Sequence, residues 1–226
     1  MHARLLPLLL LASACTAAPP PPAPAPEPEP APAAEPALPE IAAGRSVWNR
    51  DPGVQLRGGA GGATLPYLFM RLEVLEADSA EVRVRCVHCP GTPEGWIARE
   101  RVVHVPSRPE EAAGGDLAGF ALALRDAAIR QDLRALRAVM SHEFSHQLSP
   151  LEPGLLETLA AWEREGYRTL DRFPFLLDRG IAAVAGTQVW AAPPEYATDR
   201  RYADLRAGFR RGAEGWEWIF LVRDGM

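Results

Sequence analysis

Apolar and polar residues alternate with a period of two through residues 65–105, which is the pattern of half-buried β-strands. The first predicted strand turns Leu68, Met70, Leu72 and Val74 to one face, and Phe69, Arg71 and Glu73 to the other. After a turn at residues 77–79, the second carries Val82, Val84 and Cys86 on its apolar face. Two short strands at residues 95–98 and 102–105 complete the pattern, so we predict a small all-β barrel over residues 44–106.

The apolar period changes from 2 to 3.6 after a polar stretch at residues 107–115, which we interpret as a hinge. Asp116 and Asp132 are expected to begin two helices, a third follows Gly154, and Pro174 is expected to start a further turn or two that stops at Gly180. We expect short strands at residues 144–148, 181–185, 188–191, 202–209 and 216–222. Residues 116–226 are therefore predicted to form an α+β domain, with helices first and an antiparallel sheet last.

The amino terminus is not predicted to belong to either domain. Residues 1–14 combine a basic start, an apolar run and small residues before Cys15, as in a secretory signal peptide. Residues 15–43 are mostly Ala, Pro and Glu, a composition that favours a disordered, extended linker. The segment resembles a bacterial lipoprotein signal, which implies that Cys15 carries lipid; ordinary cleavage after Ala14, giving a soluble secreted protein, is the alternative.

The strand order of residues 54–105 resembles a bacterial SH3-like domain. The resemblance rests on Val54-Gln55-Leu56-Arg57 before a glycine-rich loop, a Val-Arg-Val strand, a Pro/Gly turn and Gly95-Trp96-Ile97. It implies a five-stranded barrel that serves in attachment or recognition, commonly of cell-wall peptides. Trp96 and Tyr67 are the predicted binding residues.

The carboxy-terminal half resembles the nuclear-transport-factor-2-like fold. Two helices run into Met-Ser-x-x-Phe over residues 127–144, and Trp216-Glu217-Trp218-Ile219-Phe220 forms the closing strand. Because this fold hosts both enzymes and binding domains, the resemblance predicts no function.

The net charge of −5 argues against general nucleic-acid binding, and every basic side chain is Arg. Five arginines cluster near the carboxy terminus, at positions 200, 201, 206, 210 and 211. They indicate either an anionic partner, such as a phospholipid head group, or a solvated strand edge.

The segment from His142 to His146 matches H-E-x-x-H, the zinc-protease motif. That chemistry needs His142 and His146 on one face of a helix, Glu143 as the base, and a third ligand such as Glu157 or Glu163. Ser149-Pro150 would end such a helix one turn after His146. The alternative interpretation places both histidines at a helix-to-strand turn around a buried Phe144.

Cys86 and Cys89 form the second candidate group. In an exported protein two cysteines this close favour a small disulfide, with free thiols or a metal site using His88 and His104 as alternatives. A thioredoxin-like helix is not expected, because Pro90-Gly91 follows directly.

Our main hypothesis is a non-enzymatic lipoprotein of the cell envelope, without a cofactor. It would be bound to the membrane by lipid at Cys15 and would contact peptidoglycan or an envelope protein. In a two-membrane cell we expect it at the outer membrane, facing the periplasm. The alternative hypothesis is a zinc-dependent hydrolase that uses His142, Glu143 and His146.

Overall fold

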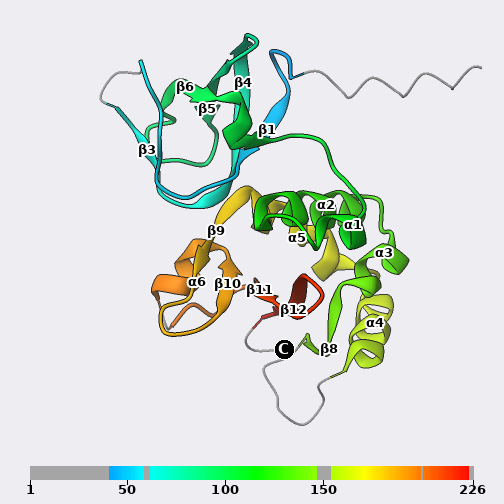
Figure 1. The fold of residues 1–226 in the computed structure, drawn as a ribbon. Coiled ribbons are helices and arrows are strands. Elements are labelled where there is room, and N and C mark those ends of the chain that lie inside the picture. The colour runs from blue at the N-terminus through cyan, green and yellow to red at the C-terminus, as the bar shows by residue number, and fades with distance from the viewer. Residues whose placement is uncertain (1–40, 59–61, 147–153, 200, 224–226) are drawn as a thin grey trace, which may run out of the picture. The chain divides into compact units, whose positions relative to one another are not determined.

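The computed structural model describes residues 41–58, 62–146, 154–199 and 201–223, so the signal peptide, Cys15 and most of the linker lie outside the described residues. The described chain is a mixed sheet with several helices (Figure 1). Among these residues no helix combines the length and the apolar character needed to cross a bilayer.

The amino-terminal strands are short and mostly antiparallel, as the alternation predicts. They are β1 (Ser46–Asn49), β2 (Val54–Gln55), β3 (Thr64–Leu65), β4 (Leu68–Ala77), β5 (Glu81–Cys86), β6 (Glu94–Ala98) and β7 (Val102–Val103), with a 3-10 turn at Arg99–Arg101. β4 pairs with β1 and β5, β5 with β6, and β1 with β7, while β2 and β3 pair with each other. An isolated bridge between Arg57 and Trp96 links the end of β2 to β6.

The linker boundary expected at residue 43 lies too far along the chain. Ile41 is only 3% exposed and packs among the apolar side chains of β1, β4 and β5. The described chain is therefore already packed two residues before that boundary, because burying this aliphatic side chain removes apolar surface from water.

The helices begin with α1 (Pro109–Ala112), which lies inside the stretch expected as a hinge. They continue with α2 (Leu117–Ile129), α3 (Leu133–Ala138), α4 (Leu155–Arg164), α5 (Arg168–Asp178) and α6 (Pro194–Thr198). Both predicted caps are confirmed, since the carboxylate of Asp116 accepts from Gly119 N at 2.7 Å and that of Asp132 from Ala135 N at 3.0 Å.

The prediction that Pro174 begins a helix is wrong. α5 begins six residues earlier and holds Pro174 in its interior. Leu170, Phe173 and Leu177 are fully buried, so the packing of this helix outweighs the backbone hydrogen bond that proline cannot donate.

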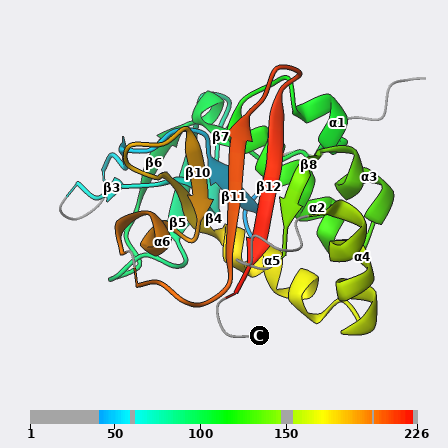
Figure 2. The same cartoon turned by 90° about the horizontal axis from the view of Figure 1, so that it is seen from below.

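The carboxy-terminal strands are β8 (Met140–Ser145), β9 (Arg179–Ala183), β10 (Val189–Ala192), β11 (Arg206–Arg211) and β12 (Trp216–Val222). Figure 2 shows β10, β11, β12 and β8 side by side, and β8 runs parallel to β12. The expectation of a purely antiparallel sheet is therefore wrong. Two long helices and three strands lie between β8 and β12 in the chain, so no hairpin forces this pair to run antiparallel.

One sheet runs through both halves of the described chain. Leu68 and Met70 at the start of β4 pair with Ile181 and Arg179 of β9. The described residues belong to one compact unit, Leu38–Met226. The stretch at residues 107–115 therefore does not interrupt the sheet.

Phe69 does not lie on the polar face that the alternation predicts. It is fully buried, its φ of 59° lies in the left-handed region, and its ring stacks on Trp48 at 5.6 Å between centroids. Such a backbone conformation is unfavourable for a bulky residue and needs support from its surroundings. The irregularity lets Leu68 and Phe69 join the core formed with α2 and α5, while Met70 joins the core of the amino-terminal strands.

Candidate functional site

Trp96 lies half-exposed on β6, next to a surface groove of about 480 Å³. The groove is lined by Gly58, Arg83, Gly91, Thr92, Pro93, Glu94, Gly95 and Trp96. A Cβ atom added at Gly95 would lie 2.7 Å from Leu56 Cβ and 2.9 Å from Arg57 O, so only glycine lets the end of β2 approach β6 this closely. The Gly-Trp-Ile pattern therefore closes the strands and places the indole beside the groove.

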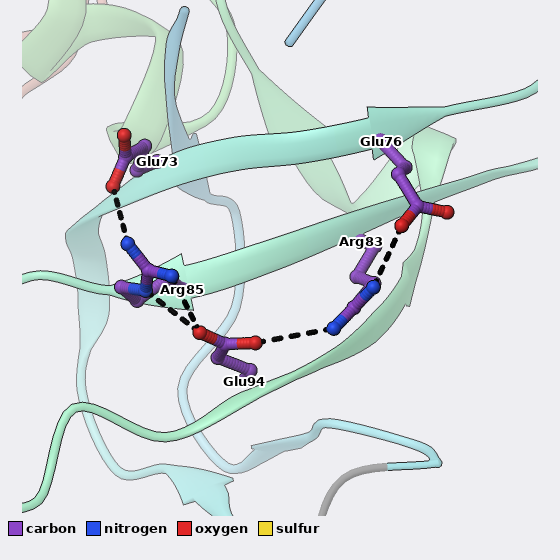
Figure 3. A network of polar contacts seen from close by, with 5 residues as sticks. All are labelled: Glu73, Glu76, Arg83, Arg85 and Glu94. Atoms are coloured by element: carbon purple, nitrogen blue, oxygen red, sulfur yellow. Dashed lines mark hydrogen bonds and ion pairs between the residues drawn. The ribbon is translucent and has the colours of Figure 1, made fainter. Parts of the chain in front are cut away.

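Two arginines and three glutamates form a network on the same exposed strands (Figure 3). Arg85 donates from Nε to Glu94 Oε1 at 2.8 Å and lies 3.3 Å from Glu73 through its terminal nitrogen. Arg83 donates to Glu76 at 2.6 Å and to the second oxygen of Glu94 at 3.2 Å. The network thus fixes one guanidinium and one carboxylate where they line the groove with Trp96.

The charge state of Glu94 follows from these contacts. The hydrogen bond from Arg85 holds the pKa of the Glu94 carboxyl below its ordinary value, and the same bond raises the pKa of the Arg85 guanidinium. A general acid at neutral pH needs a carboxyl with a raised pKa. The groove is thus better equipped to recognise a polar ligand with an indole face and fixed charges than to transfer a proton.

Tyr67, the other predicted binding residue, lies elsewhere. Its carbonyl oxygen accepts from Asn49 Nδ2 at 2.7 Å, and a Cβ atom at Gly180 would lie 3.1 Å from Tyr67 Cβ. It belongs to the junction of β4 and β9 and is not among the described residues that line the groove. Trp96 and Tyr67 therefore do not form a joint site at the groove.

Cys86 and Cys89 are joined by a disulfide in the structure. Cys86 is fully buried at the end of β5, and its N–H donates to Pro93 O at 2.9 Å, while Thr92 N donates to Cys89 O at 3.0 Å. The bridge and these bonds define the turn from β5 to β6, whose residues 91–93 line the groove.

The H-E-x-x-H segment lies on strand β8 up to Ser145, and not on a helix. On an extended strand, residues four apart are separated by roughly 13 Å, too far for two imidazoles to bind one zinc ion. Phe144 is fully buried, as the alternative interpretation predicted, and His146 Nδ1 lies 3.1 Å from Thr158 Oγ1. Among the described residues, no group of three or more His, Cys, Asp or Glu side chains is placed to hold a metal ion.

The carboxy-terminal arginines do not form one surface. Arg206 is 2% exposed, with its guanidinium 5.0 Å from the ring centroid of Tyr196. Arg210 pairs with Glu217 at 3.0 Å, and Arg211 donates to Gly115 O at 2.8 Å. The expected solvated edge is also wrong, since β11 lies between β10 and β12; Arg200 falls outside the described residues.

A buried ionic cluster that the sequence did not reveal joins the two halves of the sheet. Asp178, only 1% exposed, accepts two hydrogen bonds from Arg125 at 2.8 and 2.9 Å and one from Trp48 Nε1 at 2.9 Å. Arg125 also lies over the Trp48 ring at 4.8 Å. Since Trp48 and Asp178 are 130 positions apart, no local pattern could have brought them together.

Comparison of the chain with protein-family models, curated proteins and solved structures found no match.

Proposed function

We propose that the chain is a non-enzymatic lipoprotein of the cell envelope, whose amino-terminal strands form an SH3-like module that contacts the cell wall. The observation that carries the proposal is the groove at Trp96, where a half-exposed indole lies beside Arg83 and Glu94. Aromatic and arginine side chains are enriched where proteins bind their partners. An envelope protein is the alternative ligand of the same groove.

The strand pairing supports the SH3-like part of the proposal. β1, β4, β5 and β6 follow one another in antiparallel pairs, β7 adds to β1, and the Arg57–Trp96 bridge brings the β2 segment to the far side of β6. These contacts enclose an apolar core that includes Val47, Leu72 and Ile97. A nuclear-transport-factor-2-like fold for residues 116–226 belongs to the same proposal, supported by helices α2 and α5 packed on β11 and β12.

The envelope location is supported by the amino-terminal sequence. A signal that ends before Cys15 would give a lipid anchor, and the Ala/Pro/Glu linker would hold the packed residues away from the bilayer. Thr16 follows Cys15, where an aspartate would resemble the inner-membrane retention signal of bacterial lipoproteins. We therefore assign the protein to the outer membrane of a two-membrane cell, facing the periplasm.

Trp96→Ala should reduce binding to purified peptidoglycan by about tenfold or more, because it removes the only large aromatic face among the described residues of the groove. Sedimentation of the protein with peptidoglycan at several concentrations measures this. Trp216→Ala, which changes another half-exposed tryptophan outside the groove, should bind as the parent does. Equal retention of Trp96→Ala and the parent would contradict the groove as the binding site, and no retention of the parent would reject the cell wall as ligand.

Cys15→Ser should move the protein from the membrane pellet to the soluble fraction or leave it unprocessed, because serine lacks the thiol that accepts the lipid. Fractionation and the mass of the mature amino terminus measure this. Cys86→Ser and Cys89→Ser, which open the disulfide and leave Cys15 intact, should stay in the membrane pellet. A soluble parent without acyl mass on its first residue would instead indicate ordinary cleavage after Ala14.

A further inference from the structure

A cavity of about 140 Å³ lies at the edge of the sheet where β8 and β12 end. These two strands are parallel, so their carboxyl ends meet at the same edge, and residues around the turn from α4 to α5 complete the lining. Among the described residues, the cavity shares none of its lining with the groove at Trp96. It is therefore a separate candidate site, independent of the function proposed for that groove.

The inner wall of the cavity is apolar. Trp162 is 1% exposed and Leu221 is fully buried, and both side chains belong to the core formed with α2 and α5. Ala161 adds its methyl group to the same lining. An apolar protein cavity of about 150 Å³ is large enough to bind one benzene ring. The volume and the apolar wall thus favour a small organic molecule over an inorganic ion.

Trp162 also carries an unsatisfied hydrogen-bond donor. Its indole Nε1 is buried and has no hydrogen-bond partner among the described residues. Buried indole N–H groups normally find an acceptor, because an unpaired one has given up its hydrogen bond to water. Trp218 Nε1 is unpaired as well, but Trp218 is not among the described residues that line the cavity. A ligand oxygen at the inner wall would therefore supply the acceptor that Trp162 lacks.

Two exposed arginines line the same cavity. Arg164 lies in the last turn of α4, and Arg223 directly follows β12. Arg164 donates from Nε to the carbonyl oxygen of Ala160 at 3.3 Å. The Nε atom of Arg223 lies 3.4 Å from the carboxylate of Asp204. Because a guanidinium has five N–H donors, the terminal nitrogens of both side chains keep donors for a ligand.

The charges around the cavity favour an anionic ligand. Glu165, the acidic residue of the described lining, accepts from the backbone N–H of Thr169 in the first turn of α5 at 3.2 Å. Asp204 is shared, because it lies 3.4 Å from Arg172 as well as from Arg223. Three guanidinium groups, those of positions 164, 172 and 223, thus face two carboxylates. The surplus of one positive charge, on a chain whose net charge is −5, suits a carboxylate.

His146 completes the lining in a fixed position. Its Nδ1 lies 3.1 Å from Thr158 Oγ1, and that hydroxyl donates to Gly154 O at 2.9 Å. Since the hydroxyl has a single proton, it accepts from His146 Nδ1. Thr158 is fully buried, so the imidazole is held by a side chain that belongs to the packed face of α4.

We propose that this cavity binds a small aromatic carboxylate of about the size of benzoate. Its ring lies against Trp162 and Leu221, and its carboxylate pairs with Arg164 and Arg223. An oxygen substituent on the ring accepts from Trp162 Nε1. The apolar wall sets the size of the ligand, and the two arginines select its charge.

The probe is 4-hydroxybenzoate, titrated into the full chain while the indole N–H resonances are followed by proton–nitrogen NMR. Trp162→Phe removes one of these resonances and so identifies it, and the phenyl ring keeps most of the buried packing. We expect the Trp162 resonance to move downfield and to saturate, because an acceptor deshields the indole proton. The neutral 4-hydroxybenzamide, which has the same shape, should bind about tenfold more weakly.

Arg164→Gln and Arg223→Gln should each weaken the binding of 4-hydroxybenzoate about tenfold, because each removes a charged donor. Both positions are exposed, so the variants are expected to fold. Arg137→Gln is the matched control. Arg137 is exposed in the last turn of α3, as Arg164 is in the last turn of α4, and it is not among the described residues of the cavity. This variant should bind the probe as the parent does.

Three results would overturn the proposal. If 4-hydroxybenzoate moves no indole resonance of the parent at millimolar concentration, the cavity does not bind this class of ligand. If the amide binds as tightly as the carboxylate, or if the two arginine variants bind as Arg137→Gln does, the arginines do not select a carboxylate. If the probe binds while the Trp162 resonance stays in place, the indole is not the donor and the ligand lies elsewhere.

Discussion

Asp178→Asn is expected to lower the free energy of unfolding by about 3 to 5 kcal/mol, the largest loss we expect from a single polar substitution. Asparagine can still accept from Trp48 Nε1, but it cannot neutralise Arg125, whose side chain is only 16% exposed. Arg71, 3.7 Å from the second carboxylate oxygen, loses this ion pair as well. The cost arises because a guanidinium that is mostly removed from water is left without a counter-charge.

Urea denaturation measures this loss as a lower midpoint with an unchanged slope. Asp171→Asn is the matched control, since Asp171 lies on the same helix, is exposed, and accepts a side-chain hydrogen bond from Gln131 at 3.1 Å. Its effect should stay below about 0.5 kcal/mol. A loss under about 1 kcal/mol for Asp178→Asn would contradict the view that this cluster stabilises the junction of β1, α2 and α5.

Trp218→Ala is expected to destabilise the protein by a similar amount, about 3 to 5 kcal/mol. Its ring is fully buried, with centroids 4.5 Å from Phe173, 4.9 Å from Phe144 and 5.7 Å from Trp162. Alanine would remove the centre of this cluster and leave a cavity among three rings that belong to three different elements. Since Trp218 Nε1 has no hydrogen-bond partner among the described residues, the loss is one of packing.

Trp216→Ala, two positions earlier on the same strand, is the control. That ring is half-exposed and is held by one hydrogen bond to Gly115 O at 3.2 Å and by Arg211 at 5.5 Å. We expect a loss of about 1 kcal/mol, measured by the same denaturation curves. Equal losses in the free energy of unfolding for Trp218→Ala and Trp216→Ala would contradict the view that the ring contacts of Trp218 stabilise this core more than other tryptophan contacts do.

Part of the candidate site could be read from neighbouring residues. The strand that carries Trp96 was predicted from the alternation in Gly95-Trp96-Ile97, and Gly95 is needed where β6 meets Leu56. The disulfide was expected because Cys86 and Cys89 are only three positions apart. Tyr67 was predicted as a binding residue without such a local reason, and the structure places it at the junction of β4 and β9, away from the groove.

The H-E-x-x-H segment shows the limit of motif reading. Its letters fit a helix that binds zinc, but β8 is held as a strand by its pairing with β12 and by the burial of Phe144 against Trp162 and Trp218. A motif specifies residue types, whereas the chemistry needs those residues at one point in space. Here the pairing of β8 with β12 and the burial of Phe144 decided the backbone conformation.

By itself, the sequence determined those elements whose signals lie within a few residues. β12 spans residues 216–222 as predicted, because the alternation of polar and apolar residues is visible within the strand itself. α2 begins after Asp116, because a capping side chain binds a backbone N–H of the first helical turn. Only the tertiary structure decided that Phe69 turns inward, that β8 runs parallel to β12, and that Asp178 meets Trp48 and Arg125. Each of these depends on the burial of groups far apart in the chain, and such burial is set by the packing of whole elements rather than by any local pattern.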